Sequence, residues 1–507
     1  MIPLALDPPA SSKDALSIKV AKGGAIAFLG QGATRVASFA LQLVLSNGLG
    51  VKLYGVYSLS INIMEWAQQI CLMGTPSGLV RFSAAYSAEG SPKKVQELIN
   101  SAFLLGLCSS LVGTGILLGL SGIISEKLVH DSAWSSHLRW FFLSLPVLIF
   151  FNLLQALMRG FQRIDKMVLL GILRATAQLF FAGSLLAMSF SLAGVMGAYF
   201  LGALCAATVG LIFLRKMGWS VLRGGISPLG ELLAFSFPVF LASFSHLVVS
   251  RLDLLLLGYF HGAQEAGLYR AALTVASMVN FILGALNTAF APMISELHQS
   301  GRGKELEEIY GRVTRWVLGV ALPLGVVVSI FSFEILQLFG RGFEEAGGAL
   351  IILAIAQLCN SSTGPVGFML QMTGKERWFM VNYIVSALVN ASSNLVLIPA
   401  LGATGAAIGT GFSIMLVNVL GVVELWIFRR IHPWSKLSLV YLIAAAIGAL
   451  AALGLEGSIG LWPVSLGGAI VVYLAIVGKA GFPQEDRMVA STLWSHLKDK
   501  ILGQRKP

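Results

Sequence analysis

Uninterrupted apolar runs of about 20 residues recur along the whole chain, and a run of that length spans the roughly 30 Å hydrocarbon core of a bilayer as an α-helix. The runs are rich in Leu, Ala, Gly and Val, whereas the strands of a membrane barrel alternate apolar and polar residues over about ten positions. Because a backbone in lipid must satisfy its own hydrogen bonds, helices are the spanning element that fits. The sequence therefore predicts an all-α polytopic membrane protein with about 14 transmembrane helices.

Composition and charge agree with a chain that lies in lipid. Of the 507 residues, 56% are hydrophobic and only 12% are charged, which a water-soluble domain could not expose without aggregating. The net charge of +11 suggests nucleic-acid binding at first sight, but the positive-inside rule explains it better. With the N-terminus in the cytoplasm, most Lys and Arg residues fall on the cytoplasmic side. We therefore expect a multi-pass protein of the inner (plasma) membrane, with both termini cytoplasmic and no nucleic-acid partner.

Motifs for cofactor, metal or enzyme chemistry are missing from the sequence. Its four cysteines make no pair at metal-ligand spacing, and its seven histidines form no HExxH cluster. The loops between apolar runs are short, so the chain has no room for a soluble catalytic domain. We expect no cofactor, no metal and no enzymatic activity; the helix bundle itself must perform the function, which favours transport.

Two local similarities predict an internal duplication. The stretch 194–198 (GVMGA) resembles 402–406 (GATGA), 402 − 194 = 208 residues later, and Leu53-Tyr54 recurs as Leu268-Tyr269, 268 − 53 = 215 residues later. Similar offsets at distant points fit a repeat of six helices, which keeps both copies in the same orientation. We expect a six-helix lobe in 23–222, a second in 223–432 and a central cleft between them. Residues 433–479 would add two further helices, and 1–22 and 480–507 would be a cytoplasmic segment and tail.

Polar side chains inside the apolar runs indicate where that cleft lies. A charged residue at a helix centre costs roughly 2.5–3.5 kcal/mol, so it should face a cavity or a partner. In the first run polar residues recur at steps of four, three and four, which places them on one helix face. Similar faces occur in the second, seventh, eighth and eleventh runs. The candidate cleft residues are Gln31, Arg35, Ser38, Gln42, Asn62, Glu65, His246, Ser250, Arg251, Asp253, Asn280, Asn287 and Asn390.

Helix packing is the alternative role for these residues, since Ser and Asn also hydrogen-bond across membrane helices. Glu65 could form a structural ion pair with Arg35 instead of lining a cleft. Arg174 lies two turns into its run, so we expect it to extend to the cytoplasmic interface. Arg270 is expected at the outer rim.

Three stretches of the chain resemble a known family. They are GQGATRVASFALQLVLSNGLGVKLYGVYSLS from Gly30, RLDLLLLGYFHGAQEAGLYRAA from Arg251 and LGATGAAIGTG from Leu401. The sequence resembles the polysaccharide-unit flippases of the multidrug/oligosaccharidyl-lipid/polysaccharide (MOP) exporter superfamily. The resemblance implies twelve core helices in two lobes, sometimes extended to fourteen, with alternating access and a cleft often lined by basic side chains.

The same resemblance implies a function. It indicates a flippase that moves a polyprenyl-diphosphate-linked oligosaccharide from the cytoplasmic to the outer leaflet for cell-surface polysaccharide synthesis. Besides this saccharide, the expected partners are membrane lipid and the glycosyltransferases and polymerase of the same pathway. Coupling to H⁺ or Na⁺ stays open. The alternatives are a cation-coupled multidrug exporter, a lipid-linked peptidoglycan precursor flippase and, less in keeping with the short loops, a membrane glycosyl-polymerase.

Overall fold

The computed structural model describes residues 12–221, 225–226, 229–459 and 462–480. These residues form helices joined by short turns, in agreement with the predicted all-α class. Half of the predicted N-terminal segment (1–11) and almost all of the predicted C-terminal tail (481–507) lie outside the described residues. The α-helices are α1 (Ser12–Leu72), α2 (Thr75–Ala88), α3 (Pro92–Ile124), α4 (Ser135–Phe142), α5 (Leu145–Gly160), α6 (Ile164–Ala187), α7 (Leu192–Lys216), α8 (Leu229–Val279), α9 (Phe281–Gln299), α10 (Gly303–Ile330), α11 (Ser332–Gln337), α12 (Gly347–Ser362), α13 (Val366–Met372), α14 (Glu376–Arg429), α15 (Lys436–Ile459) and α16 (Trp462–Ala480).

Three helices are too long to cross a bilayer once. The helices α1, α8 and α14 contain 61, 51 and 54 residues, and a straight helix of 50 residues would measure about 75 Å. Each contains one glycine with non-helical backbone angles: Gly50 (φ 69°, ψ 175°), Gly262 (φ 78°, ψ −168°) and Gly402 (φ 55°, ψ −133°). The first two combinations are essentially restricted to glycine. Each long helix is therefore two helical segments joined at a kink.

These kinks explain why fewer helices are counted than the sequence predicts. Among the described residues, ten helices are long and apolar enough to cross a membrane, or eleven if the bent pair α4 and α5 forms one span. Each kink lies between two of the apolar runs that the sequence separates. The protein is thus a multi-pass membrane protein with ten to eleven candidate spans.

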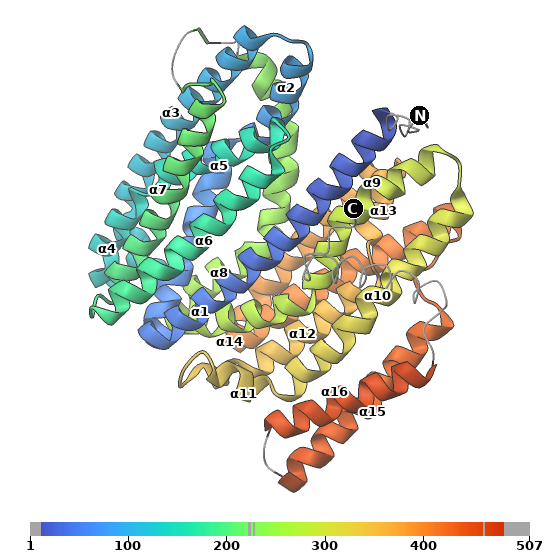
Figure 1. The fold of residues 1–507 in the computed structure, drawn as a ribbon. Coiled ribbons are helices and arrows are strands. Elements are labelled where there is room, and N and C mark those ends of the chain that lie inside the picture. Colours follow the sequence, from blue (N-terminus) through green and yellow to red (C-terminus); the bar gives the residue numbers. More distant parts are fainter. Residues whose placement is uncertain (1–11, 222–224, 227–228, 460–461, 481–507) are drawn as a thin grey trace, which may run out of the picture.

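The helices form two groups that meet at one end and diverge at the other (Figure 1). The N-terminal group consists of α2 to α7, and the C-terminal group of α9, α10, α12, α13 and α14. The long helices α1 and α8 lie between the groups: α1 contacts α6 and α8, and α8 contacts α2 on one side and α12 and α14 on the other. Any space between the groups is consequently lined by α1 and α8.

Close backbone contact joins α1 and α8 near their kinks. A Cβ added to Gly55 would collide with the carbonyl oxygen of Ala263, and one added to Gly267 would lie 2.5 Å from the carbonyl oxygen of Val51. Side chains would keep the two helices apart, so glycine is required for this approach. The contact lies at the end where the two helix groups meet.

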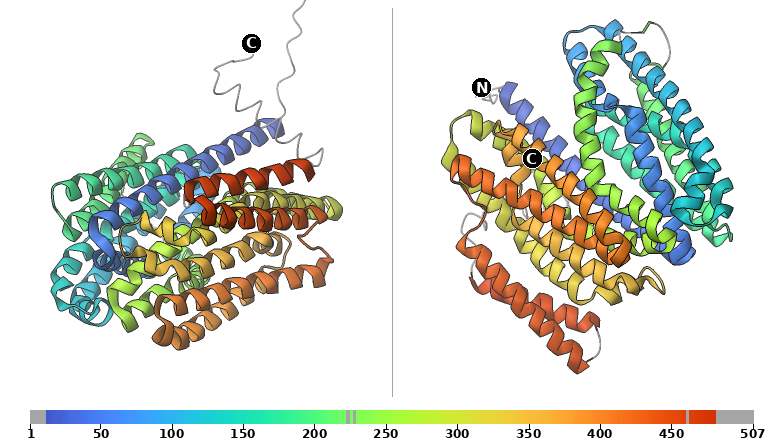
Figure 2. Two further views of the ribbon diagram at one scale, coloured as in Figure 1. Left: turned by 90° about the horizontal axis from the view of Figure 1, so that it is seen from below. Right: turned by 180° about the vertical axis from the view of Figure 1, so that it is seen from behind.

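The last two helices form a separate hairpin on the C-terminal group (Figure 2). The hairpin of α15 and α16 packs mainly on α10. Tyr441 and Tyr473 are buried against Leu318 and Leu322 of α10, and the Tyr473 hydroxyl donates a 3.0 Å hydrogen bond to the carbonyl oxygen of Gly319. This position at the edge of the bundle keeps the hairpin away from the space beside α1 and α8.

Candidate functional site

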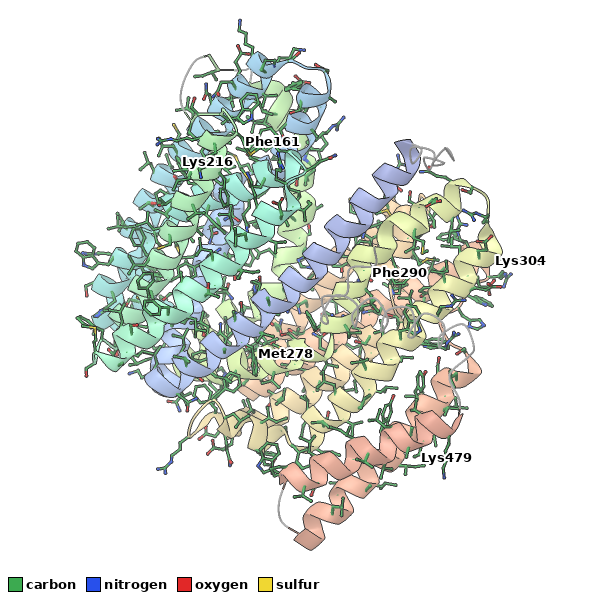
Figure 3. The ribbon with its side chains drawn as sticks, viewed as in Figure 1. Phe161, Lys216, Met278, Phe290, Lys304 and Lys479 are labelled. Atoms are coloured by element: carbon green, nitrogen blue, oxygen red, sulfur yellow. The ribbon has the colours of Figure 1, made fainter. Side chains whose placement is uncertain are left out.

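Three adjoining cavities lie along α1 and α8. The first, about 390 Å³, is enclosed by α1, α5, α6, α7 and the second half of α8. The second, about 270 Å³, lies between α1, both halves of α8 and α12. The third, about 380 Å³, lies among α8, α9, α12, α13 and α14. We call them the N-terminal, central and C-terminal cavities. Met278, labelled near the middle of Figure 3, lines the central cavity.

Shared lining residues connect the three cavities. Ser38, Gln42 and Arg270 line both the N-terminal and the central cavity. Ser250 and Gln357 line both the central and the C-terminal cavity. The cavities therefore form one polar cleft that extends from the N-terminal helix group to the C-terminal group.

Positive charge is concentrated in two of the cavities. Arg174, Arg270 and Glu65 line the N-terminal cavity, and Arg35, Arg251 and Arg270 line the central one. Four arginines against one glutamate give these described residues a formal charge of 4 − 1 = +3. Guanidinium groups stay charged and present planar sets of donors, which suits phosphate or carboxylate ligands.

One ion pair crosses the cleft from α1 to α8. The Arg251 Nε lies 2.7 Å from the Glu65 Oε2, and about a third of each side chain is exposed. Beside it, the Asn62 Nδ2 donates a 3.1 Å hydrogen bond to the carbonyl oxygen of Arg251. Glu65 thus pairs with Arg251, and the pair with Arg35 considered from the sequence does not form. Within the described residues Arg35 has no carboxylate partner; its guanidinium lies 6.0 Å from the centre of the Phe281 ring.

The structure corrects the expected positions of two arginines. Arg174 does not extend to the membrane interface, because its guanidinium lies over the rings of Phe151 and Tyr199, 5.0 and 5.3 Å from their centres, and lines the N-terminal cavity. Arg270 lines two cavities instead of an outer rim. Arg174 lies 174 − 164 = 10 residues after the start of α6, and Arg270 lies 270 − 262 = 8 residues after the kink in α8, so their positions along the sequence favoured an interfacial role.

Carboxamide side chains dominate the C-terminal cavity. None of the described residues that line it is Asp, Glu, Lys or Arg. Its seven carboxamides are Asn280, Asn287, Gln357, Asn360, Gln371, Asn382 and Asn418.

Nine of the thirteen cleft residues that the sequence suggests line these cavities. They are Arg35, Ser38, Gln42, Glu65, His246, Ser250, Arg251, Asn280 and Asn287. Three others, Asn62, Asp253 and Asn390, are buried in helix contacts. The Gln31 side chain lies outside the described residues.

Sequence reasoning missed the contribution of the tenth and twelfth apolar runs. Gln357 and Asn360 lie three positions apart on α12, and Asn418 is on α14. The spacing of Gln357 and Asn360 places them on one helix face. A search for polar faces in the tenth run as well would have found these two residues.

Asp253 is buried in a cluster of hydroxyl and amide groups. The carboxylate is 1% exposed and accepts hydrogen bonds from Tyr269 at 2.5 Å and Thr410 at 2.9 Å. Asn390 donates a 3.4 Å hydrogen bond to Thr410 and accepts one of 3.0 Å from Asn394, whose own Oδ1 is buried without a partner among the described residues. Asp253 thus links the two halves of α8 with α14, away from the three cavities.

Comparison with known proteins places this architecture in a family. The profile of the family described as polysaccharide biosynthesis protein matches residues 20–298, more than half of the chain. The chain belongs to this family. A second profile, MatE, matches residues 238–396.

Individual proteins resemble this chain in sequence or in fold. A Haloferax volcanii protein named "Probable flippase AglR" is 24% identical over 413 residues, covering 80% of this chain and 83% of the relative. The structure of the lipid II flippase MurJ in an inward closed conformation superposes with a TM-score of 0.68, at 12% identity over 88% of this chain and 97% of that one. An inward-facing MATE-family multidrug transporter gives 0.66, at 15% identity over 77% and 93%. The polysaccharide biosynthesis family member described here is a multi-pass membrane protein with a MATE- and MurJ-like fold.

Proposed function

We propose that this family member is a flippase that translocates a polyprenyl-diphosphate-linked oligosaccharide from the cytoplasmic to the outer leaflet by alternating access, for the synthesis of a cell-surface polysaccharide. One observation carries the proposal: a cleft with a formal charge of +3 adjoins a cavity lined by uncharged hydrogen-bonding groups. The two chemistries match the two polar parts of such a substrate.

The diphosphate would bind in the cationic part of the cleft. Arg35 is free of carboxylates among the described residues, and Arg270 lies where the N-terminal and central cavities meet. Arginines on both sides of the central cavity, on α1 and α8, can donate to different oxygens of one diphosphate. The prenyl chain would remain in the surrounding lipid, since its transfer into a polar cleft would be unfavourable.

Topology supports a transporter with two moving halves. If each kinked helix crosses the membrane twice, the eleven candidate spans become 11 + 3 = 14. These spans would form the six-helix lobes 23–222 and 223–432 and the hairpin 433–479 at the edge. Both termini would then be cytoplasmic. The glycine kinks at Gly50 and Gly262 occupy corresponding positions in the two lobes, each between the first and second span of its lobe. With the cell interior negative, outward movement of an anion is favoured by roughly 2.3 kcal/mol per charge per 100 mV.

A cation-coupled multidrug exporter is the second candidate, and buried Asp253 favours it. An ionised carboxylate in this position is costly unless a proton or a cation neutralises it. The four arginines in the cleft weigh against a cationic drug as the cargo, because they would repel it. A lipid-linked peptidoglycan precursor flippase would differ from the proposed flippase only in the group attached to the diphosphate. Binding of a proton or cation at Asp253 could drive transport in either flippase.

A reconstituted flipping assay tests the proposal. Purified protein in liposomes receives a fluorescent undecaprenyl-diphosphate oligosaccharide, and an impermeant quencher reports the leaflet that the lipid occupies. Protein-dependent translocation of this lipid, with no efflux of a cationic dye under the same gradients, is the expected result. Dye efflux without lipid translocation would support the drug exporter instead, and elongated saccharide chains in the products would indicate a polymerase.

A further inference from the structure

The C-terminal cavity differs from the rest of the cleft in both charge and composition. It is lined by seven carboxamides, by the polar residues His246, Ser250 and Tyr383, and by no formally charged side chain among the described residues. Carboxamides present donors and acceptors together on each side chain. Sugar hydroxyls also donate and accept, so a neutral sugar is the ligand class whose hydrogen bonding this lining matches.

Two of these carboxamides have no hydrogen-bond partner in the described part of the protein. Within the described residues, Asn287 and Gln371 form no hydrogen bond, and the Asn287 Oδ1 is buried without a partner. An unsatisfied buried amide costs about 1–3 kcal/mol unless a ligand or water completes it. Asn418, by contrast, accepts a 2.8 Å hydrogen bond from Thr363 and donates one of 2.8 Å to the Ile414 carbonyl oxygen, so it holds the wall in place.

Three neighbouring aromatic rings also line the C-terminal cavity. The rings of Phe379 and Tyr383 are 4.7 Å apart between centres, and that of His246 lies 5.9 Å from Tyr383. All three residues line the cavity. Aromatic faces offer large rigid contact area at low entropic cost, and a sugar ring presents C–H groups that can pack against such a face while its hydroxyls reach the amides opposite.

The position of the cavity determines which part of a substrate would reach it. Ser250 and Gln357 are shared with the central cavity, which Arg35, Arg251 and Arg270 line. A group bound in the C-terminal cavity is therefore directly beside a group bound to these arginines. In a diphosphate-linked saccharide, that neighbour is the sugar at the reducing end.

From these contacts we infer that the C-terminal cavity is a selectivity site for the sugar next to the diphosphate, and that it accepts an uncharged sugar and disfavours an acidic one. The inference rests on the proposed function and adds a preference to it. A uronic-acid carboxylate in this cavity would lose water without gaining a cationic partner from the lining, which is unfavourable. A neutral sugar would satisfy Asn287 and Gln371 instead.

Three lipid probes test the selectivity: undecaprenyl diphosphate, its glucose derivative and its glucuronic-acid derivative. Binding to purified protein is measured for wild type, for the Asn287→Leu/Gln371→Met double variant and for Gln264→Met, an exposed residue of α8 outside the three cavities. These replacements are close in size and leave no described protein group without a partner. We expect wild type to prefer the glucose lipid over the glucuronic-acid lipid by about tenfold or more. The double variant should bind the glucose lipid about tenfold more weakly, about 1.4 kcal/mol, and sugar-free undecaprenyl diphosphate within about twofold of wild type.

Each other result has a distinct meaning. Equal binding of the two sugar lipids by wild type would overturn the inference, as would a double variant that loses all three lipids equally or none. Gln264→Met should bind all three lipids like wild type. If this control variant also loses binding of the glucose lipid, the loss in the double variant would reflect a general disturbance of the protein, and the assignment of the cavity would be refuted. If wild type binds none of the three lipids, the proposed function itself fails, and the inference fails with it.

Discussion

Replacement of Arg35 by alanine separates substrate binding from folding more cleanly than any other change in the cleft. Arg35 is exposed, lines the central cavity and has no carboxylate partner within the described residues. Its only described contact with a ring is the 6.0 Å approach to Phe281, worth about 0.5 kcal/mol at an exposed site. Removal of Arg251 would instead leave Glu65 without its 2.7 Å partner. We therefore expect Arg35→Ala to change the free energy of unfolding by less than about 1 kcal/mol.

The effect on substrate should be much larger. A hydrogen bond to a charged group contributes about 1.5–3 kcal/mol, so Arg35→Ala should weaken binding of a polyprenyl diphosphate by roughly 10- to 150-fold. Arg35→Lys keeps the charge but loses the planar pair of donors, and we expect an intermediate loss. For both variants, we would measure the affinity for undecaprenyl diphosphate and the rate of flipping in liposomes.

Arg341→Ala is the matched control, because Arg341 is exposed and lies outside the three cavities. It should bind and flip like wild type. The reasoning is refuted if Arg35→Ala, purified intact with unchanged thermal stability, binds and flips the lipid as well as wild type does. An equal loss of binding and flipping in Arg341→Ala would also refute it, because the effect would then depend on the net charge of the protein and not on the position of Arg35 in the cleft.

Three further experiments test other parts of the structure. In a double-mutant cycle with Glu65→Gln and Arg251→Gln, thermal unfolding should give a coupling of about 1 kcal/mol, as for a part-exposed pair; additive effects would argue against an interaction. Asp253→Asn should abolish the response of flipping to an imposed proton or sodium gradient while lipid binding persists, and an unchanged gradient response would exclude Asp253 from coupling. Gly50→Ala should lower stability by about 1–3 kcal/mol because of its φ of 69°, whereas Gly119→Ala, in open space on α3, should be neutral or stabilising; similar melting temperatures for the two variants would contradict the strain argument.

The fold class follows from the sequence because lipid imposes strict limits on the backbone. Apolar runs of bilayer length identify the helices without any tertiary information. The way these runs join was harder to predict. Gly50, Gly262 and Gly402 adopt positive φ within continuous helices, and many of the 56 glycines in the chain could have done so. Each of the three lies between two apolar runs, so the sequence indicates where a break falls, but not that helix continues on both sides of it.

The cleft was partly predictable for a related reason. Polar faces at helical spacing found Arg35, Ser38 and Gln42 because one helix face suffices to recognise them. Spacing could not separate Ser250, which lines two cavities, from Asp253, which is buried against Tyr269 and Thr410. The two lie three positions apart on α8, so their different surroundings depend on α14, far away in the sequence.

The glycine contact between α1 and α8 has a consequence for the transport cycle. The helices α1 and α8 bend at the end where the helix groups converge (Figure 1). Gly55 and Gly267 bring the two backbones together beside these kinks, and a cargo that leaves through that end must separate them. At these two positions backbone meets backbone without interlocked side chains, so opening there costs mainly dispersion contacts and the entry of water or lipid, whereas Leu59, which packs against Gly258, must also be withdrawn. The same two glycines that bring the backbones together also keep side chains from locking the two helices to each other at that point.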